Sequence, residues 1–224
     1  MAVQMVESKH VQRIQQNILA AAERRLLDWL CARVPARIMP DHMTAIGVLG
    51  WVAVAAGYAL SPYRLAWLWL SIAGFCINWF GDSLDGSLAR FRKSERPQFG
   101  YFMDHSLDAI GNLAIALGLA ASSFVRLDVA LFAISGYLLL SVHTFLTARQ
   151  TGQFQLTYLA GGPTELRLML IAMTLLMLAT GPRSMQVNGW SVFDLFIGGF
   201  GLVLILLFVL QTARIGRELF LSGK

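Results

Sequence analysis

The sequence has few charged residues and few cysteines. Of its 224 residues, 14% are charged and two are cysteine, whereas 56% are hydrophobic, and the mean hydropathy is +0.59. Ordinary soluble domains carry about 25% charged residues, so the composition argues against a water-soluble globule. It also excludes a disordered chain, a collagen and a disulfide scaffold. Cys31 and Cys76 are expected to be small packing residues.

The apolar residues gather in six segments of the kind that form bilayer-spanning helices. These segments are about Met43–Leu60, Tyr63–Gly81, Asp104–Val125, Asp128–Ala148, Leu166–Thr180 and Trp190–Ala213. No Pro- or Ser-rich linker and no fixed repeat divides them. The sequence therefore predicts an all-α integral membrane protein, with six transmembrane helices in one domain over residues 41–224.

Residues 1–40 have a different pattern. Apolar residues recur at roughly helical spacing between charged ones from Val11 to Val34, and Pro35 and Pro40 follow. This pattern predicts an amphipathic helix that lies along the membrane surface. The segment lacks the apolar core and cleavage site of a signal peptide, so we expect it to stay in the mature protein.

Basic residues are distributed unevenly between the two sides of the six segments. Fifteen of the 18 Lys and Arg residues fall on one side, and three, Arg64, Arg126 and Arg183, fall on the other. Because positively charged loops stay in the cytoplasm, both termini and the loop Arg90–Gly100 are expected there. The net charge of +5 is thus attributed to membrane orientation rather than to nucleic-acid binding. Small size and the lack of a targeting segment favour a bacterial inner membrane.

Four of the thirteen acidic residues lie at the predicted cytoplasmic ends of the second and third segments: Asp82, Asp85, Asp104 and Asp108. By helical spacing, the first two share a face with Gly86 and Ala89, and the last two share a face with Gly100. Two antiparallel helices are therefore expected to present four carboxylates across a gap lined by small residues.

Clustered carboxylates beside a bilayer repel one another unless cations neutralise them. Their all-oxygen ligand set favours Mg²⁺ or Mn²⁺ over zinc or iron. A carboxylate-bound Mg²⁺ with open positions usually binds phosphate oxygens. The expected substrate is therefore a phosphate or diphosphate ester at the membrane surface.

The four aspartates belong to a longer pattern. It runs Asp82-Ser-Leu-Asp85-Gly86-Ser-Leu-Ala89-Arg90, then nine residues, then Gly100-Tyr-Phe-Met-Asp104-His-Ser-Leu-Asp108. This pattern resembles the signature of the CDP-alcohol phosphotransferases (class I CDP-alcohol phosphatidyltransferases), with a spacer one residue longer than usual. Upstream, Pro40-Asp41-His42-Met43-Thr44 resembles the Pro-Asn-x-x-Thr string of many members, with Asp in place of Asn.

The resemblance implies transfer of a substituted phosphate group from a CDP-alcohol to an acceptor alcohol, with release of CMP, in phospholipid biosynthesis. By position, two divalent cations, Mg²⁺ or Mn²⁺, would be held by Asp82, Asp85, Asp104 and Asp108. Asp108 would be a further ligand or the catalytic base. The nucleotide would lie against Thr44, Asp82, Gly86, Ala89, Arg90 and Gly100.

The acceptor pocket is less closely defined by the sequence. Its candidates, His143, Arg149 and Arg167, lie near the same predicted surface as a patch of Ser and Thr residues in the fourth segment. The alternative is structural, because Ser and Thr in membrane helices commonly bond to their own backbone. The donor is either CDP-diacylglycerol or a CDP-aminoalcohol, and the Thr164-Glu165 pair faintly resembles the aminoalcohol branch.

Two other classes of protein share part of this pattern. Intramembrane prenyltransferases also bind a diphosphate through aspartate pairs and Mg²⁺, but they would leave Gly86, Ala89, Arg90 and Gly100 without a role. A cation transporter would need polar groups across the whole bilayer, whereas the second and third segments are almost wholly apolar beyond the cluster. Glycine-rich helix faces would allow a homodimer. The sequence assigns no role to Asp194.

Overall fold

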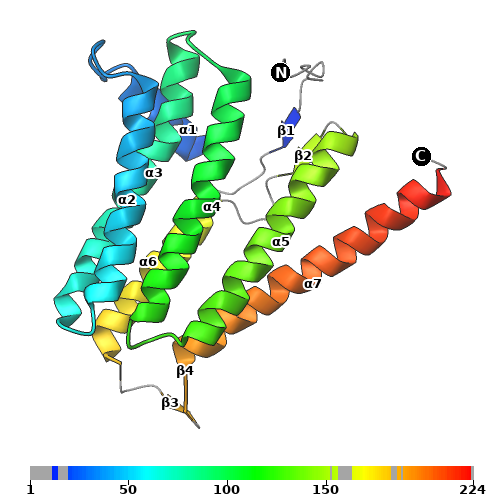
Figure 1. Cartoon of the computed structure of the whole chain (residues 1–224). Coiled ribbons are helices and arrows are strands. Elements are labelled where there is room, and N and C mark those ends of the chain that lie inside the picture. Colours follow the sequence, from blue (N-terminus) through cyan, green and yellow to red (C-terminus); the bar gives the residue numbers. More distant parts are fainter. Residues whose placement is uncertain are drawn as a thin grey trace, which may run out of the picture.

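The computed structural model describes residues 12–14, 20–151, 153–155, 163–182, 186–187 and 189–222. These ranges contain seven α-helices: α1 (Ala20–Cys31), α2 (Pro40–Leu60), α3 (Leu68–Phe91), α4 (Pro97–Ala121), α5 (Leu127–Thr151), α6 (Pro163–Thr180) and α7 (Val192–Leu221). A 3₁₀ turn, Leu65–Trp67, precedes α3. Helices α2 to α7 correspond to the six predicted segments, and consecutive helices run in opposite directions (Figure 1).

Four of these helices are long and apolar enough to cross a membrane. They are α2, the Leu127–Ala148 part of α5, α6 and α7. Helices α3 and α4 are as long, but Asp82, Asp85, Asp104 and Asp108 lie within them and lower their hydropathy. The predominantly helical architecture is confirmed, whereas six membrane crossings and the orientation of the termini stay predictions.

The N-terminal segment differs from the expected long helix. Helix α1 is confined to Ala20–Cys31. Residues Gln12–Ile14 form the short strand β1, which pairs in parallel with β2 (Gln153–Gln155), so the helix predicted from Val11 is wrong for these three residues. A second short pair, antiparallel, joins β3 (Gln186–Val187) to β4 (Trp190–Ser191) before α7.

Helices α2 and α3 are packed backbone to backbone through glycines. A Cβ atom built on Gly74 would lie 2.6 Å from the backbone nitrogen of Val54 and 2.8 Å from the carbonyl oxygen of Gly50. Within this contact, Asn78 Nδ2 donates to the Gly47 carbonyl at 3.1 Å. Small residues permit this approach, which fixes the position of the α3 carboxylates relative to α2.

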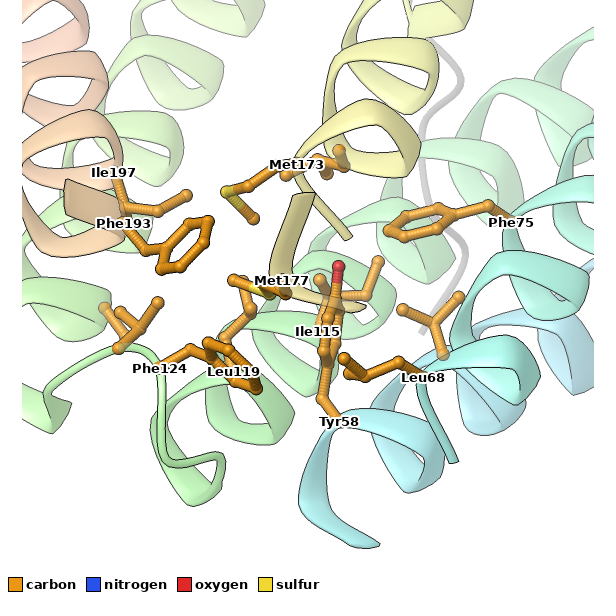
Figure 2. Packing of buried hydrophobic residues seen from close by; sticks show 14 of the residues in the cluster. Tyr58, Leu68, Phe75, Ile115, Leu119, Phe124, Met173, Met177, Phe193 and Ile197 are labelled. Atoms are coloured by element: carbon orange, nitrogen blue, oxygen red, sulfur yellow. The ribbon is translucent and has the colours of Figure 1, made fainter. Parts of the chain in front are cut away.

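The main hydrophobic core lies at the end of the bundle away from those carboxylates. Figure 2 shows Tyr58, Phe75, Met177 and Phe193 converging there from α2, α3, α6 and α7. The Tyr58 hydroxyl hydrogen-bonds the Thr174 hydroxyl at 2.6 Å, so the one strongly polar group among these side chains is satisfied. A second, smaller cluster joins α1, α2 and α3 at the carboxylate end: Leu27, Cys31, Met43, Leu84 and Leu88.

The end of α3 is fixed to the connection between α1 and α2. Lys93 adopts a positive φ of 54°, and Ser94 N donates to the Ala89 carbonyl at 3.0 Å, an ending that glycine more often provides. Arg92 donates to the carbonyls of Val34 at 3.0 Å and Pro35 at 2.9 Å. Arg92 is therefore a structural residue, in addition to its charge on this side of the bundle.

Asp194 has a structural role that the sequence did not indicate. It is buried in the first turn of α7, where its carboxylate accepts from Ser191 N at 2.9 Å and from Arg126 N at 2.8 Å. The Ser191 hydroxyl accepts from Asp194 N at 2.9 Å and donates to the Phe124 carbonyl at 2.7 Å. This capping box joins the connection between α4 and α5 to the start of α7.

Replacing Gly74 by alanine should weaken the contact between α2 and α3. The new methyl group would meet backbone atoms that cannot rotate away, and overpacking of this kind costs about 1–3 kcal/mol. Gly199→Ala is the matched control, because a Cβ atom there meets nothing within 4 Å. In thermal unfolding in detergent, the unfolding temperature should fall clearly for Gly74→Ala and not for Gly199→Ala. Equal stability of the two variants would contradict the glycine contact.

Candidate functional site

A cavity of about 1760 Å³ opens at the end of the bundle where α3 passes into α4. All seven helices contribute to its wall, and the four predicted aspartates all line it. Helix α2 packs against both α3 and α4, while α3 and α4 make few contacts with each other in the described chain. The expected gap between the two carboxylate-bearing helices is therefore present and wide.

Three of the four aspartates also line one narrow recess of this cavity. Asp82 and Asp85 come from α3 and Asp104 from α4, and Thr44 and Asn78 complete the polar part of its wall. The Thr44 hydroxyl donates to Asp85 Oδ2 at 2.7 Å. The threonine of the upstream string thus lies against the second aspartate of the main pattern, although 41 residues separate them in sequence.

Arg167 enters the site from α6. Its Nε donates to Asn78 Oδ1 at 2.8 Å, and its Nη2 forms an ion pair with Asp82. The Arg167 side chain is 13% exposed and the Asp82 side chain 23%, so this pair is screened by solvent less than a surface pair would be. One positive charge from the predicted acceptor group therefore already neutralises one carboxylate.

The chemistry of the carboxylates suits a divalent cation. Among the residues that the structure describes, no three His, Cys, Asp or Glu side chains converge as metal ligands. The donors that line the narrow recess are nevertheless oxygen atoms of Asp82, Asp85 and Asp104, the type that Mg²⁺ prefers. The fit therefore rests on donor type and shared location.

The small residues of the pattern face open space. A Cβ atom on Gly86 would meet only the Arg90 guanidinium, at 3.4 Å from Nη1, and one on Gly100 would meet nothing within 4 Å. Both residues line the cavity, as do Ala89 and Arg90. This distinguishes them from Gly74, which packs against a neighbouring helix, so helix packing does not explain the glycines of the pattern.

The other two predicted acceptor residues are placed differently. His143 is buried between α5 and α7, with Nδ1 3.1 Å from the Thr212 hydroxyl and Nε2 3.3 Å from the Thr147 hydroxyl, and it is not part of the cavity wall. Its position matches the alternative of a satisfied interior histidine. The side chain of Arg149 lies outside the described residues.

The hydroxyls of the fourth segment bond to their own helix, as the structural alternative expects. Ser141 Oγ donates to the Tyr137 carbonyl at 2.9 Å, and Thr144 Oγ1 donates to the Leu140 carbonyl at 2.8 Å. Ser141, Thr144 and Tyr137 nonetheless line the cavity. Backbone bonding therefore satisfies these hydroxyls without removing them from the wall.

Asn78 is a site residue that the predicted set omitted. Its amide joins the Gly47 carbonyl to Arg167, so it connects α3, on which it lies, to both α2 and α6. The available signal was its spacing, one helical turn before Asp82 on the same face. Its partners on α2 and α6 could not be read from that spacing.

The cavity has an apolar wall beside its polar end. Ile115, Leu140, Phe200, Val203 and Leu207, from α4, α5 and α7, line it together with the aspartates. Leu207 and its neighbours belong to a helix apolar enough to lie in a bilayer. One continuous space therefore offers carboxylates at one end and a hydrocarbon-like surface at the other.

Comparison with known proteins identifies related chains. The model of the CDP-alcohol phosphatidyltransferase family matches residues 37–213. The phosphatidylinositol phosphate synthase of Cutibacterium acnes is 37% identical over 89 residues, which are 40% of this chain and 41% of that protein. The archaetidylinositol phosphate synthase of Methanothermobacter thermautotrophicus is 32% identical over 118 residues, 53% of this chain and 56% of its own.

A further archaetidylinositol phosphate synthase, from Pyrococcus horikoshii, is 31% identical over 104 residues, which are 46% of this chain and 52% of that protein. The matches thus span about half the length of these curated relatives.

The pair of Arg167 and Asp82 should behave as one energetic unit. Removing either partner leaves a half-buried charge without its counterion, so Arg167→Gln and Asp82→Asn should each lower the stability of the protein. The double variant should lose less than the sum of the two, with a coupling energy of about 0.5–3 kcal/mol from unfolding in detergent. Arg214 and Glu218, whose side chains are 73% and 62% exposed, are the control pair. Their coupling energy should be about 0.3–0.5 kcal/mol. Additive losses at the first pair would contradict the contact.

Proposed function

Because the chain belongs to the CDP-alcohol phosphatidyltransferase family, we propose that it transfers a substituted phosphate group from a CDP-alcohol to an acceptor alcohol. The acceptor hydroxyl oxygen forms a bond to the phosphorus on the alcohol side of the diphosphate. The bond from that phosphorus to the bridging oxygen breaks, and CMP leaves with the bridging oxygen and its electron pair. The hydroxyl proton passes to a carboxylate of the site.

The observation that carries this proposal is the amphipathic cavity. A lipid-linked CDP-alcohol has a charged diphosphate and an apolar tail, and the cavity offers carboxylates that can hold cations beside an apolar wall on α4, α5 and α7. A substrate with its headgroup at the carboxylates could keep its tail against Phe200 and Leu207. This arrangement favours a lipid donor over a wholly water-soluble pair of substrates.

Asp82, Asp85, Asp104 and Asp108 are the proposed ligands of two divalent cations, Mg²⁺ or Mn²⁺. When bound, such cations neutralise the diphosphate and the charge that develops on the leaving CMP. Asp108 lines the same cavity one helical turn beyond Asp104, and it is also the proposed base that takes the acceptor proton. Thr44 orients the Asp85 carboxylate through its 2.7 Å hydrogen bond.

The nucleotide is proposed to lie along the face of α3 that carries Gly86, Ala89 and Arg90, and against Gly100 at the start of α4. The open space beside both glycines supports this placement, because a ligand can approach their backbone closely. Arg90 donates to the Ser87 hydroxyl at 3.2 Å, which holds the guanidinium at the edge of this surface.

The acceptor is proposed to be a phosphorylated polyol such as an inositol phosphate. The names of the relatives describe synthesis of phosphatidylinositol phosphate and archaetidylinositol phosphate, which favours a lipid donor over the aminoalcohol direction. Arg167 supports an anionic acceptor, because it brings a positive charge and charge-assisted N–H donors to the carboxylate end of the cavity. His143 bonds to Thr212 of α7 and does not line the cavity, so it is not included in the proposed acceptor pocket.

The site is proposed to open to the cytoplasm of a bacterial cell, with the protein in the inner membrane. The distribution of Lys and Arg residues supports this orientation. The carboxylates, the start of α4 and the end of α7 then lie on one side of the membrane, where CMP is released.

The deciding experiment measures CMP release by detergent-purified protein with Mg²⁺. CDP-diacylglycerol and CDP-choline or CDP-ethanolamine are offered separately, each with inositol phosphate, inositol, glycerol phosphate or diacylglycerol. We expect release from CDP-diacylglycerol with inositol phosphate, and loss of release when EDTA is added. If a thermal unfolding assay shows that the protein is folded and it releases CMP from none of the donors, the transferase proposal is refuted.

Asp108→Asn should abolish turnover while the protein stays folded and inserted. The amide cannot accept a proton and binds divalent cations weakly, so the rate should fall by at least about 10²-fold. The same assay measures the rate, and thermal unfolding checks the fold. Undiminished turnover by the folded variant would remove Asp108 from the mechanism.

Gly86→Leu should block the proposed nucleotide surface without affecting helix packing. The new side chain would project into the cavity, so the unfolding temperature should stay within about 2–4 °C of the native value. The KM for the CDP-alcohol donor should rise at least about tenfold because the side chain occupies space beside the nucleotide. An unchanged donor KM would place the nucleotide elsewhere.

A further inference from the structure

Glu23 joins three helices at the edge of the cavity. This half-buried residue of α1 accepts hydrogen bonds at one carboxylate oxygen, Oε1, from two side chains of α3 and one of α6. The donors are Trp79 Nε1 at 2.8 Å, Ser83 Oγ at 3.3 Å and Thr164 Oγ1 at 3.0 Å. A charged acceptor makes each of these bonds stronger than a neutral one would.

These bonds run parallel to the contacts of Arg167. Trp79 and Ser83 directly follow Asn78 and Asp82, the two residues that bind Arg167. Thr164 precedes Arg167 by three residues, which is nearly one helical turn. Helices α3 and α6 are thus connected by two successive polar bridges, of which the outer passes through Glu23 and the inner through Arg167.

The start of α6 depends on such bridges because its apolar anchoring there is weak: Leu166 is only partly buried against the main core. The first buried side chain of this helix is Leu170, followed by Met173, Thr174 and Met177. Before Leu170, the described contacts with α3 include the two polar bridges at Thr164 and Arg167. Loss of the outer bridge would therefore loosen the turn that carries Arg167, which would be held only by the partly buried Leu166 and by the inner bridge.

We infer that Glu23 is a positioning residue, which holds the first turn of α6 on α3 and so sets the place of the Arg167 guanidinium in the site. Glu23 acts through Thr164 and takes no part in the chemical step. The inference rests on the proposed function only in assigning Arg167 to the acceptor, and the positional claim stands on its own.

The positional claim is tested without turnover. Cys76 is an exposed cysteine of α3 and Cys31 is buried, so nitroxide labels on Cys76 and on Leu168→Cys, a position 50% exposed on α6, report the distance between the helices by pulsed electron paramagnetic resonance. Glu23→Ala should broaden or shift this distance distribution. Glu23→Gln, which keeps a carbonyl acceptor, should preserve it, as should Asp28→Ala, which removes an exposed carboxylate from the same helix.

The functional consequence is tested by steady-state kinetics. Glu23→Ala should raise the KM for the acceptor about tenfold, with the donor KM changed less than about twofold. Thr164→Val, which removes the hydroxyl and keeps the shape, should have the same effect, and the double variant should be no worse than either. A general loss of folding would instead lower the apparent kcat and the unfolding temperature and leave both KM values unchanged. Glu23→Gln should keep the native acceptor KM.

The outcomes separate this inference from the proposed function. An unchanged distance distribution in Glu23→Ala overturns the positioning role, whatever the enzyme does. A changed distribution together with an unchanged acceptor KM overturns the link to Arg167. If Glu23→Ala changes the distance distribution and the native protein releases no CMP, the bridge is supported and only the transferase proposal is refuted.

Discussion

The structure is organised around the cost of holding carboxylates beside a bilayer. Asp82, Asp85, Asp104 and Asp108 line one cavity, where like charges repel and burial disfavours ionisation. The Arg167 guanidinium pairs with Asp82, and the Thr44 hydroxyl donates to Asp85. The same demand for positive charge would be met by the proposed cations, so the electrostatic cost and the proposed chemistry have one origin.

Glycines have two different roles around this cavity. On α2 and α3, residues such as Gly74 let the backbones touch, and this rigid pair carries Thr44, Asp82 and Asp85. Gly86 and Gly100 face open space instead, so they cost helix stability without improving packing. Such a cost is understandable where a ligand must approach the backbone, which is why these two positions carry more functional information than the packed ones.

The sequence predicted what depends on spacing along one chain segment and missed what depends on partners. Helical periodicity placed the four aspartates on the correct faces, and hydropathy found six helices. Spacing also predicted the gap between α3 and α4, but neither signal shows which helix packs against which, so the bridging role of Asn78 was out of reach. His143 and Asp194 illustrate the same limit, since a polar residue in an apolar run has a similar pattern whether it lines a pocket, bonds across helices or caps one.

The distribution of the core explains how one small bundle provides both a polar site and a place for a lipid. Tyr58, Met177 and Phe193 close the end away from the carboxylates, while α7 leans away from α2 and α3 toward the other end (Figure 1). The space this leaves is bounded by apolar residues of α7 and by the carboxylates of α3 and α4. Closing it with more apolar contacts would stabilise the bundle but remove the cavity, so polar bridges such as those of Glu23 and Arg167 hold the open end where packing cannot.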